Sequence, residues 1–276
     1  MAVFELVSAD WLAQHAGAAG VAVIDSRPQA DYWEGHIPHA RHLDGALLSL
    51  PRTDAPALAR FHTLLGWTLS ALGIAADTHV VVAGAQNEVN AARVAWALAY
   101  AGVARIALLD GGLKAWGGAL DRAAPAVRAT RFVPQPRAAY LATAEEVLAA
   151  TQGGARVIDA REHDEYAGLR SNARRNGRVP GARFWDTRQE LGADGRFAPR
   201  AQLAAALAQV AAPGERAIVY CGGGGRAARA FVALQLAGHA DAAVYPASWN
   251  EWGNLDQYPV DASAIAIPAA ATAPAA

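Results

Sequence analysis

The sequence predicts an α/β protein of two similar domains, each a mainly parallel sheet flanked by helices. The first observation is an internal repeat, in which residues 21–44 match residues 155–168 followed by 177–186. A second pair of segments, 79–118 and 217–254, matches in the same way. Two long copies indicate two domains of one fold, because a solenoid would repeat a shorter unit many times.

The order of elements within each copy is the second observation. Alanine-rich helical stretches at 91–102 and 227–238 each end at a glycine suited to a helix C-cap. They lie between short apolar runs typical of strands buried on both faces. Strand, helix and strand in that order imply a parallel sheet. The predicted strands are VAVID (21–25), HVVVAG (79–84), RIALLDG (105–111), RVIDA (156–160), AIVYC (217–221) and AAVYP (242–246).

The repeat and the composition along the chain predict the domain boundaries. We expect a first domain at 1–120, a second domain at 141–261 and a tail at 262–276 that contains mainly alanine and proline. The segment between the domains, 121–140, holds three prolines and no clean period, which is typical of a linker.

The bulk composition excludes several classes of protein. The 276 residues are 53% hydrophobic and 18% charged, as in globular proteins with a large core. A net charge of −1 gives no electrostatic footprint for nucleic acid or an anionic membrane, so neither is an expected partner. No apolar stretch approaches the ~20 residues of a membrane span. Because the N-terminus also lacks the features of a signal peptide, we expect a cytoplasmic protein.

The single cysteine, Cys221, stands where a predicted strand ends and four glycines begin. Ligands of parallel α/β sheets bind at the carboxyl ends of strands. The amides of Gly222, Gly223, Gly224 and Gly225, together with the start of the following helix, would favour a thiolate. Arg226 and Arg229 are the cations nearby in sequence. The alternative is a small buried residue, which a free cysteine often is.

The first copy distinguishes these two interpretations. With an offset of 136 residues, Ala85 occupies the position of Cys221, and the run of glycines is absent. One copy therefore keeps both the thiol and the glycines, and the other has neither. This asymmetry predicts an active site in the second domain and a scaffold role, without catalysis, for the first.

Several motifs recur in the two copies or flank the cysteine. They are Asp-x-Arg at Asp25/Arg27 and Asp159/Arg161, GHIPHA, GRVPGA, the loop Cys221–Arg226 and YPASWNEWG. On these motifs the chain resembles the tandem-domain rhodanese family of thiosulfate and 3-mercaptopyruvate sulfurtransferases over residues 5–257. The resemblance implies two rhodanese-like domains, with an active C-terminal one in which Cys221 carries sulfur as a persulfide and Arg226 helps to stabilise it. It also implies a small anionic sulfur donor, a cyanide or thiol acceptor such as thioredoxin or glutathione, and no cofactor.

Two features bear on the donor. The early loop positions are neutral, which favours 3-mercaptopyruvate, but Gly223 replaces the serine of such enzymes and the ending Gly225-Arg226 resembles single-domain rhodaneses. The second copy also carries eight extra residues in a segment with four arginines. By resemblance, Arg170 and Arg174 in that segment are the candidates to bind the anionic donor, since guanidinium groups suit carboxylate and thiosulfate alike. The remaining two arginines are Arg175 and Arg178.

Other functions fit the sequence less well. A cysteine-based phosphatase needs five residues between cysteine and arginine, and here four intervene. The glycines also match a dinucleotide-binding pattern, although four consecutive glycines match many patterns. A non-catalytic sulfur-binding or interaction protein stays open, because the changes at Gly223 and Gly225 could mark lost activity.

Several further residues receive structural predictions. His36, His39 and His42 suggest no metal site, because Pro38 interrupts their spacing and no cysteine or carboxylate cluster accompanies them. The two Asp-x-Arg pairs are expected to fix loops, and Trp116 and Trp252 to pack in the core or between domains. These last two residues are equivalent in the repeat. His62 resembles a histidine that approaches the site from the first domain of mercaptopyruvate enzymes.

Overall fold

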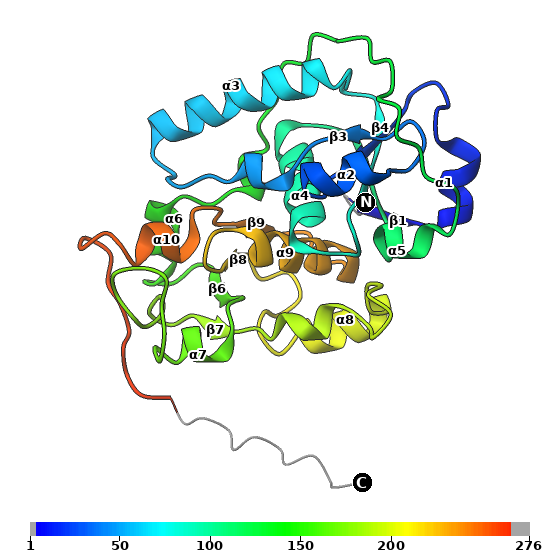
Figure 1. Ribbon diagram of the computed structural model, residues 1–276. Helices are drawn as coiled ribbons and strands as arrows, with labels where there is room; N and C mark the ends of the chain where they lie inside the picture. The colour runs from blue at the N-terminus through cyan, green and yellow to red at the C-terminus, as the bar shows by residue number, and fades with distance from the viewer. Residues whose placement is uncertain (1–3, 266–276) are drawn as a thin grey trace, which may run out of the picture.

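The computed structural model describes residues 4–265 and contains two parallel sheets, one in each half of the chain (Figure 1). The first sheet has the strand order β1-β5-β4-β2-β3, and the second has the order β7-β6-β8-β9. The elements of the first half are β1 (Phe4–Val7), α1 (Ala9–His15), β2 (Val21–Asp25), α2 (Gln29–Glu34), β3 (Arg41–His42), η1 (Gly45–Leu48), α3 (Ala55–Ala71), β4 (His79–Ala83), α4 (Val89–Ala101), β5 (Arg105–Leu109) and α5 (Gly112–Trp116).

The second half repeats this plan. Its elements are η2 (Ala138–Tyr140), α6 (Ala144–Ala150), β6 (Arg156–Asp159), α7 (His163–Tyr166), β7 (Arg183–Phe184), η3 (Thr187–Glu190), α8 (Arg200–Leu207), β8 (Ala217–Tyr220), α9 (Gly225–Ala237), β9 (Ala242–Val244) and α10 (Ser248–Trp252). The order β5-β4-β2-β3 of the first sheet corresponds to β9-β8-β6-β7 of the second. The predicted fold of two α/β domains is confirmed, with all six predicted strands in place.

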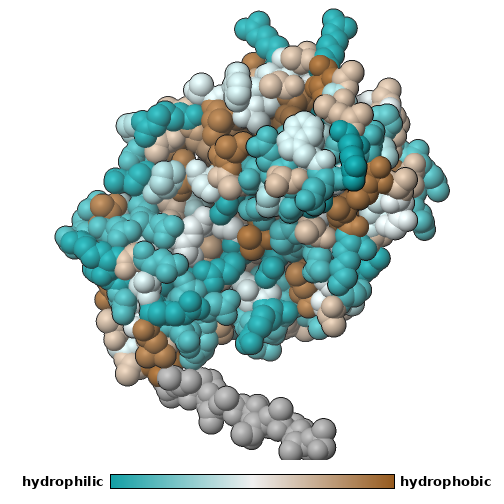
Figure 2. Space-filling view, in the orientation of Figure 1, coloured by the Kyte–Doolittle hydropathy of each residue, from teal (hydrophilic) through white to brown (hydrophobic). Residues whose placement is uncertain are grey.

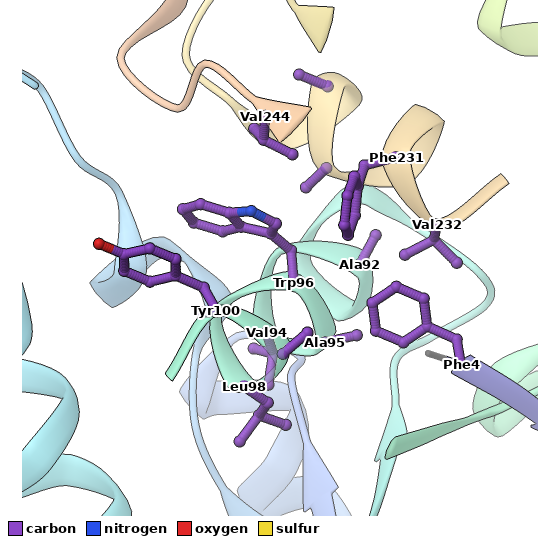
Figure 3. Packing of buried hydrophobic residues seen from close by; sticks show 14 of the residues in the cluster. Phe4, Ala92, Val94, Ala95, Trp96, Leu98, Tyr100, Phe231, Val232 and Val244 are labelled. Carbon is purple, nitrogen blue, oxygen red and sulfur yellow. The ribbon is translucent and has the colours of Figure 1, made fainter. Parts of the chain in front are cut away.

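The two domains meet at α4 and α9, which are the repeat-equivalent helices. Both end at a glycine in the left-handed conformation, Gly102 at φ 99° and Gly238 at φ 95°, so the predicted C-caps are correct. Residues of both helices belong to one hydrophobic cluster that includes Trp96 and Phe231 (Figure 3). Phe4 of β1 packs edge-on against Phe231 across the interface, with ring centroids 5.9 Å apart. The domains therefore share a continuous core.

Between α5 and η2 the chain forms no helix and only an isolated bridge between Asp121 and His36. The linker at 121–140 and the domain limits around it stay predictions, and residues 266–276 of the predicted tail lie outside the described residues. Within 4–265, no helix is both long and apolar enough to cross a membrane.

The Asp-x-Arg pairs fix loops in both domains, as predicted. Arg161 forms a buried fork with Asp159 and donates to the carbonyl oxygen of Gly177 at 2.8 Å. Arg27 does the same with Asp25 and the carbonyl oxygen of Gly35, at 2.6 Å.

The predicted structural roles of the tryptophans and histidines also appear in the packing. Trp252 is fully buried, whereas Trp116 is partly exposed and packs against the core of the first domain. His36 is buried and stacks on Tyr32 with ring centroids 3.9 Å apart. Within residues 4–265 no group of three or more metal-ligating side chains comes together.

Candidate active site

Cys221 lies between the end of β8 and the start of α9, at the carboxyl edge of the second sheet. Its side chain is 2% exposed, and its sulfur accepts a hydrogen bond from the amide of Gly224 at 3.2 Å. Its own amide donates to the Ser248 hydroxyl at 3.0 Å. The thiol thus sits inside a turn of backbone, in the position predicted from the sequence.

Each glycine of the loop faces a close neighbour, and Gly224 is the position where a side chain is excluded by backbone. A Cβ on Gly224, whose φ is 88°, would collide with the carbonyl oxygen of Pro246. A Cβ on Gly223 would lie 3.0 Å from the side-chain amide of Asn250. Glycine at these positions lets the surrounding groups close in on the loop.

The other two glycines face arginines. A Cβ on Gly222 would lie 3.3 Å from the guanidinium of Arg226, and one on Gly225 would lie 3.1 Å from that of Arg93. Two cations therefore flank the loop, one from each domain. This arrangement suits a site that receives an anion.

Helix α10 closes the loop from the other side. The amides of Trp249 and Asn250 donate to the carbonyl oxygens of Cys221 and Gly222, at 3.0 and 2.9 Å. Ser248 begins this helix with a positive φ of 57°, an uncommon conformation for a residue with a side chain. Its hydroxyl lies 4.0 Å from the Cys221 sulfur and donates to the carbonyl oxygen of Tyr245 at 2.8 Å. Ser248 is therefore the hydroxyl group adjacent to the thiol.

Arg93, on α4 of the first domain, reaches across the domain boundary. Its guanidinium donates to the carbonyl oxygen of Gly223 at 2.8 Å. Burial lowers the pKa of Arg93, and its proximity to Cys221 opposes this shift. The first domain thus contributes a cation to the cysteine loop of the second.

Arg226 lies beside the loop but is engaged by a carboxylate. Its guanidinium contacts Glu165 at 2.7 and 3.3 Å and Glu162 at 3.6 Å. Burial alone would raise the pKa of Glu165, but the hydrogen bonds from Arg226 and the Glu162 amide outweigh it, and that pKa is lowered. Burial likewise opposes the charged form of Arg226, and Glu165 with Cys221 raises its pKa overall. Direct contact of Arg226 with a bound sulfur stays a prediction.

Arg229, the second cation expected near the thiol, is engaged elsewhere. It donates to Glu190 at 2.6 Å and to the carbonyl oxygen of Thr187 at 3.2 Å. Glu190 is fully buried, and burial raises its pKa to about 7 although Arg229 opposes the shift. This pair joins α9 to η3 and is a packing feature of the second domain.

The arginines of the eight-residue insertion mostly fasten the insertion to the chain after α10. Arg174 pairs with Asp256, and Arg178 pairs with Asp261 at 2.7 Å. Arg170 is exposed and has no hydrogen-bond or ion-pair partner among residues 4–265. That Arg170 and Arg174 bind the donor stays a prediction. Arg175 donates to the carbonyl oxygens of Trp252, Gly253, Leu255 and Tyr258.

His62 lies away from the loop. Its ring nitrogen is 2.7 Å from the hydroxyl of Tyr100, and burial lowers its pKa. Tyr100 is seven residues after Arg93 on α4, about 10 Å along the helix axis. His62 therefore packs against the far end of α4 and does not accompany the groups around Cys221.

The equivalent loop of the first domain is occupied by its own carboxylate. Glu88, which corresponds to Gly224, accepts hydrogen bonds from the amides of Ala85 at 3.1 Å and Gln86 at 2.7 Å. A carboxylate there takes the amides that an incoming anion would need. This contact gives a physical reason for the predicted lack of catalysis in the first domain.

Sequence reasoning missed three groups at the site: Arg93, Ser248 and Glu165. Arg93 corresponds to Arg229 with the same offset of 136 residues. The repeat therefore shows where Arg93 lies on its helix, but not that its side chain contacts the cysteine loop. Ser248 lies within the YPASWNEWG motif and Glu165 within the DAREHDEY segment. The predictions from these two segments concern other residues, among them Asp159, Arg161 and Trp252.

Two α/β domains of one topology, with a thiol in a glycine loop in only one of them, define a tandem protein with a single cysteine-based site. The chain belongs to the rhodanese family: the model of the rhodanese-like domain matches residues 8–119 and again 143–255. This result confirms the predicted family.

Relatives of known name agree with this assignment. The thiosulfate sulfurtransferase of Corynebacterium glutamicum is 32% identical, over 93% of this chain and 90% of its own. The protein named "Probable 3-mercaptopyruvate sulfurtransferase" in Pseudomonas aeruginosa is 31% identical, over 94% and 99%. The crystal structure of SseA from Escherichia coli, described with the 3-mercaptopyruvate enzymes, has a TM-score of 0.76 and 28% identity over 88% of this chain and 98% of its own. The predicted enzyme class, a sulfurtransferase, is confirmed.

Proposed function

We propose that the protein moves a sulfane sulfur from thiosulfate or 3-mercaptopyruvate to cyanide or a thiol, through a persulfide on Cys221. The observation that carries this proposal is the thiol enclosed by the glycine loop, with the Gly224 amide 3.2 Å from the sulfur. Backbone amides arranged around a sulfur stabilise the negative charge that a terminal persulfide carries. A non-catalytic sulfur-binding protein, which is the alternative, would use the same loop. The two functions differ only in whether the protein turns over donor and acceptor.

The first half of the reaction loads the cysteine. The Cys221 thiolate attacks the outer sulfur of thiosulfate, the S–S bond of the donor breaks, and sulfite leaves with the bonding electron pair. With 3-mercaptopyruvate the C–S bond breaks instead, and the carbon takes the electron pair and a proton to give pyruvate. In both cases the new bond joins the Cys221 sulfur to the transferred sulfur.

The second half returns the free enzyme. Cyanide or a thiolate attacks the outer sulfur of the persulfide, and Cys221 leaves as a thiolate. A second cysteine is not required, because the acceptor supplies the attacking group. No organic cofactor enters this cycle.

The cations around the loop support an anionic donor. Arg93 contacts the loop at Gly223, and Arg226 lies beside Gly222. A guanidinium binds the sulfonate of thiosulfate and the carboxylate of mercaptopyruvate equally well, so these contacts fit both donors. The phosphatase interpretation has less support, because Arg226 is engaged by Glu165 and the loop is one residue short.

The test compares sulfur transfer to cyanide from each donor, using wild type beside Cys221→Ala. We expect wild type to turn over and to gain the mass of one sulfur atom after donor treatment without acceptor, and the variant to do neither. The ratio of kcat/KM values then identifies the preferred donor. Wild type that never gains a sulfur from either donor would refute the persulfide mechanism and favour the non-catalytic protein.

A further inference from the structure

An apolar groove lies on the first domain, between α3 and the segment 49–52 that precedes it. It encloses about 320 Å³. The buried side chains of Leu50 and Phe61 form its floor, and the more exposed Pro51 and Leu64 form its walls. We call it the α3 groove.

Exposed and half-buried side chains extend this surface along α3. Arg60, Leu64 and Trp67 follow the spacing i, i+4, i+7, which places them on one face of the helix. Trp67 is 72% exposed, and Leu47, shortly before the groove segment, is 63% exposed. Figure 2 shows apolar surface among polar side chains over the upper part of the molecule, which contains α3. Exposed apolar surface of this kind marks interaction sites in soluble proteins.

The groove is joined directly to the helix that closes the active-site loop. Arg52, at the rim of the groove, donates to Glu251 at 3.1 Å, and the Thr53 amide donates to the same carboxylate at 3.0 Å. Glu251 follows Asn250 on α10, and the Asn250 amide donates to the carbonyl oxygen of Gly222. A molecule seated in the groove would therefore lie next to the elements around Cys221.

Among the described residues, the rim of the groove carries one cation without an opposite charge beside it. Arg60 is exposed and has no ion-pair partner within residues 4–265. The side chain of Arg52 is 47% exposed although it contacts Asp54 and Glu251. An apolar groove beside Arg60, which is unpaired in the described part of the chain, complements a segment that carries both apolar and acidic side chains.

We propose that the α3 groove docks a protein thiol acceptor through an apolar segment with acidic residues, and so presents its thiol to the Cys221 persulfide. The inference rests on the proposed function. A protein fits better than a small thiol, because the apolar surface continues from the groove to Trp67, a further turn along α3.

The step that this docking serves balances without an oxidant. The acceptor thiolate forms a bond to the outer sulfur of the persulfide, and the bond between that sulfur and Cys221 breaks. Cys221 leaves with the electron pair as a thiolate, and the acceptor becomes the persulfide.

The test compares three acceptors with one donor: cyanide, dithiothreitol and reduced thioredoxin as the protein probe. The groove variants are Arg60→Glu and Leu64→Glu. Leu120→Glu and Arg122→Glu are the controls, since both residues are exposed and lie outside the groove, at the end of the first domain and the start of the linker. We expect kcat/KM for thioredoxin to fall roughly tenfold in the groove variants alone. Arg60→Glu reverses the rim charge, which slows association, and Leu64→Glu places a charge on the apolar wall of the groove. Transfer to cyanide and dithiothreitol should not change.

Three results would overturn the proposal. The first is equal transfer to thioredoxin by groove and control variants, or transfer to thioredoxin no faster than to dithiothreitol in wild type. The second is a parallel loss with cyanide, which would place the groove residues in the active site. The third is a concentration-dependent dimer that Leu64→Glu dissociates, which would make a second copy the occupant. Failure of the proposed function is distinct, because wild type would then transfer no sulfur to cyanide.

Discussion

The guanidinium of Arg93 and the carbonyl oxygen of Gly223 are joined by a 2.8 Å hydrogen bond that crosses from one domain to the other. The same guanidinium lies closest to where a side chain on Gly225 would stand. A residue of the domain without a thiol therefore helps to shape the loop that carries it.

Arg93→Ala should lower kcat/KM for the sulfur donor. A hydrogen bond to a charged group contributes about 1.5–3 kcal/mol, which corresponds to roughly 10- to 160-fold in rate. We expect most of the loss in KM for the anionic donor and partial recovery in Arg93→Lys. Arg131→Ala, at an exposed position, is the control. Unchanged donor kinetics in Arg93→Ala would show that its contact with the loop is dispensable.

Gly224→Ala should destabilise the protein and abolish activity. The positive φ of 88° disfavours a side chain, and the added Cβ would collide with Pro246. Gly181→Ala is the matched control, because its φ is 75° and nothing lies within 4 Å of the added atom. The control should lose about 1–2 kcal/mol from the left-handed conformation alone, and Gly224→Ala should lose more. Denaturant unfolding measures both, and equal losses would contradict the collision.

Ser248→Ala should lower both stability and the rate of persulfide formation. The Cys221 amide is buried and would lose its partner, which costs about 1–3 kcal/mol. Ser248→Gly removes the same hydroxyl but relieves the positive φ of 57°. The glycine variant should therefore be the more stable of the two, with an equally slow loading step. Single-turnover loading and thermal unfolding distinguish these effects, and wild-type loading in both variants would exclude a role for the hydroxyl.

Glu190 should make the protein less stable as the pH rises from about 4.5 to about 7. Burial raises its pKa to about 7 from an ordinary value of 4.5, so the folded state binds more protons than the unfolded state in this window. The free energy of unfolding then falls as the pH rises, and it levels off above the folded pKa. Glu190→Gln should show a smaller fall. Urea unfolding across this range measures the difference, and Glu34→Gln is the control at an exposed position. If the free energy of unfolding changes equally with pH in wild type and Glu190→Gln, Glu190 is not the cause of the fall.

The sequence was sufficient for the features that local chemistry determines. Gly102 and Gly238 end their helices as predicted, since a left-handed C-cap depends on the glycine itself. The position of Cys221 directly after its strand was predictable as well, because a short apolar run predicts a strand and the glycines that follow predict its end.

Features that depend on packing between distant segments could not be predicted in this way. Arg93 and Arg229 are equivalent in the repeat, yet one contacts the cysteine loop and the other contacts Glu190. Only the packing of α4 against α9 decides between them. The insertion gives a second example, since the sequence marks Arg174 as a candidate to bind the donor but does not reveal its ion pair with Asp256.

The shared core at α4 and α9 makes the two halves of the chain depend on each other for stability. Trp96 and Phe231 belong to the same cluster, so neither half can be removed without exposing apolar surface of the other. In its packing the molecule is equivalent to a dimer of two duplicated subunits that are joined covalently by the linker between α5 and η2. Cleavage of that linker should leave two fragments that stay associated, and the pair should unfold in a single thermal transition.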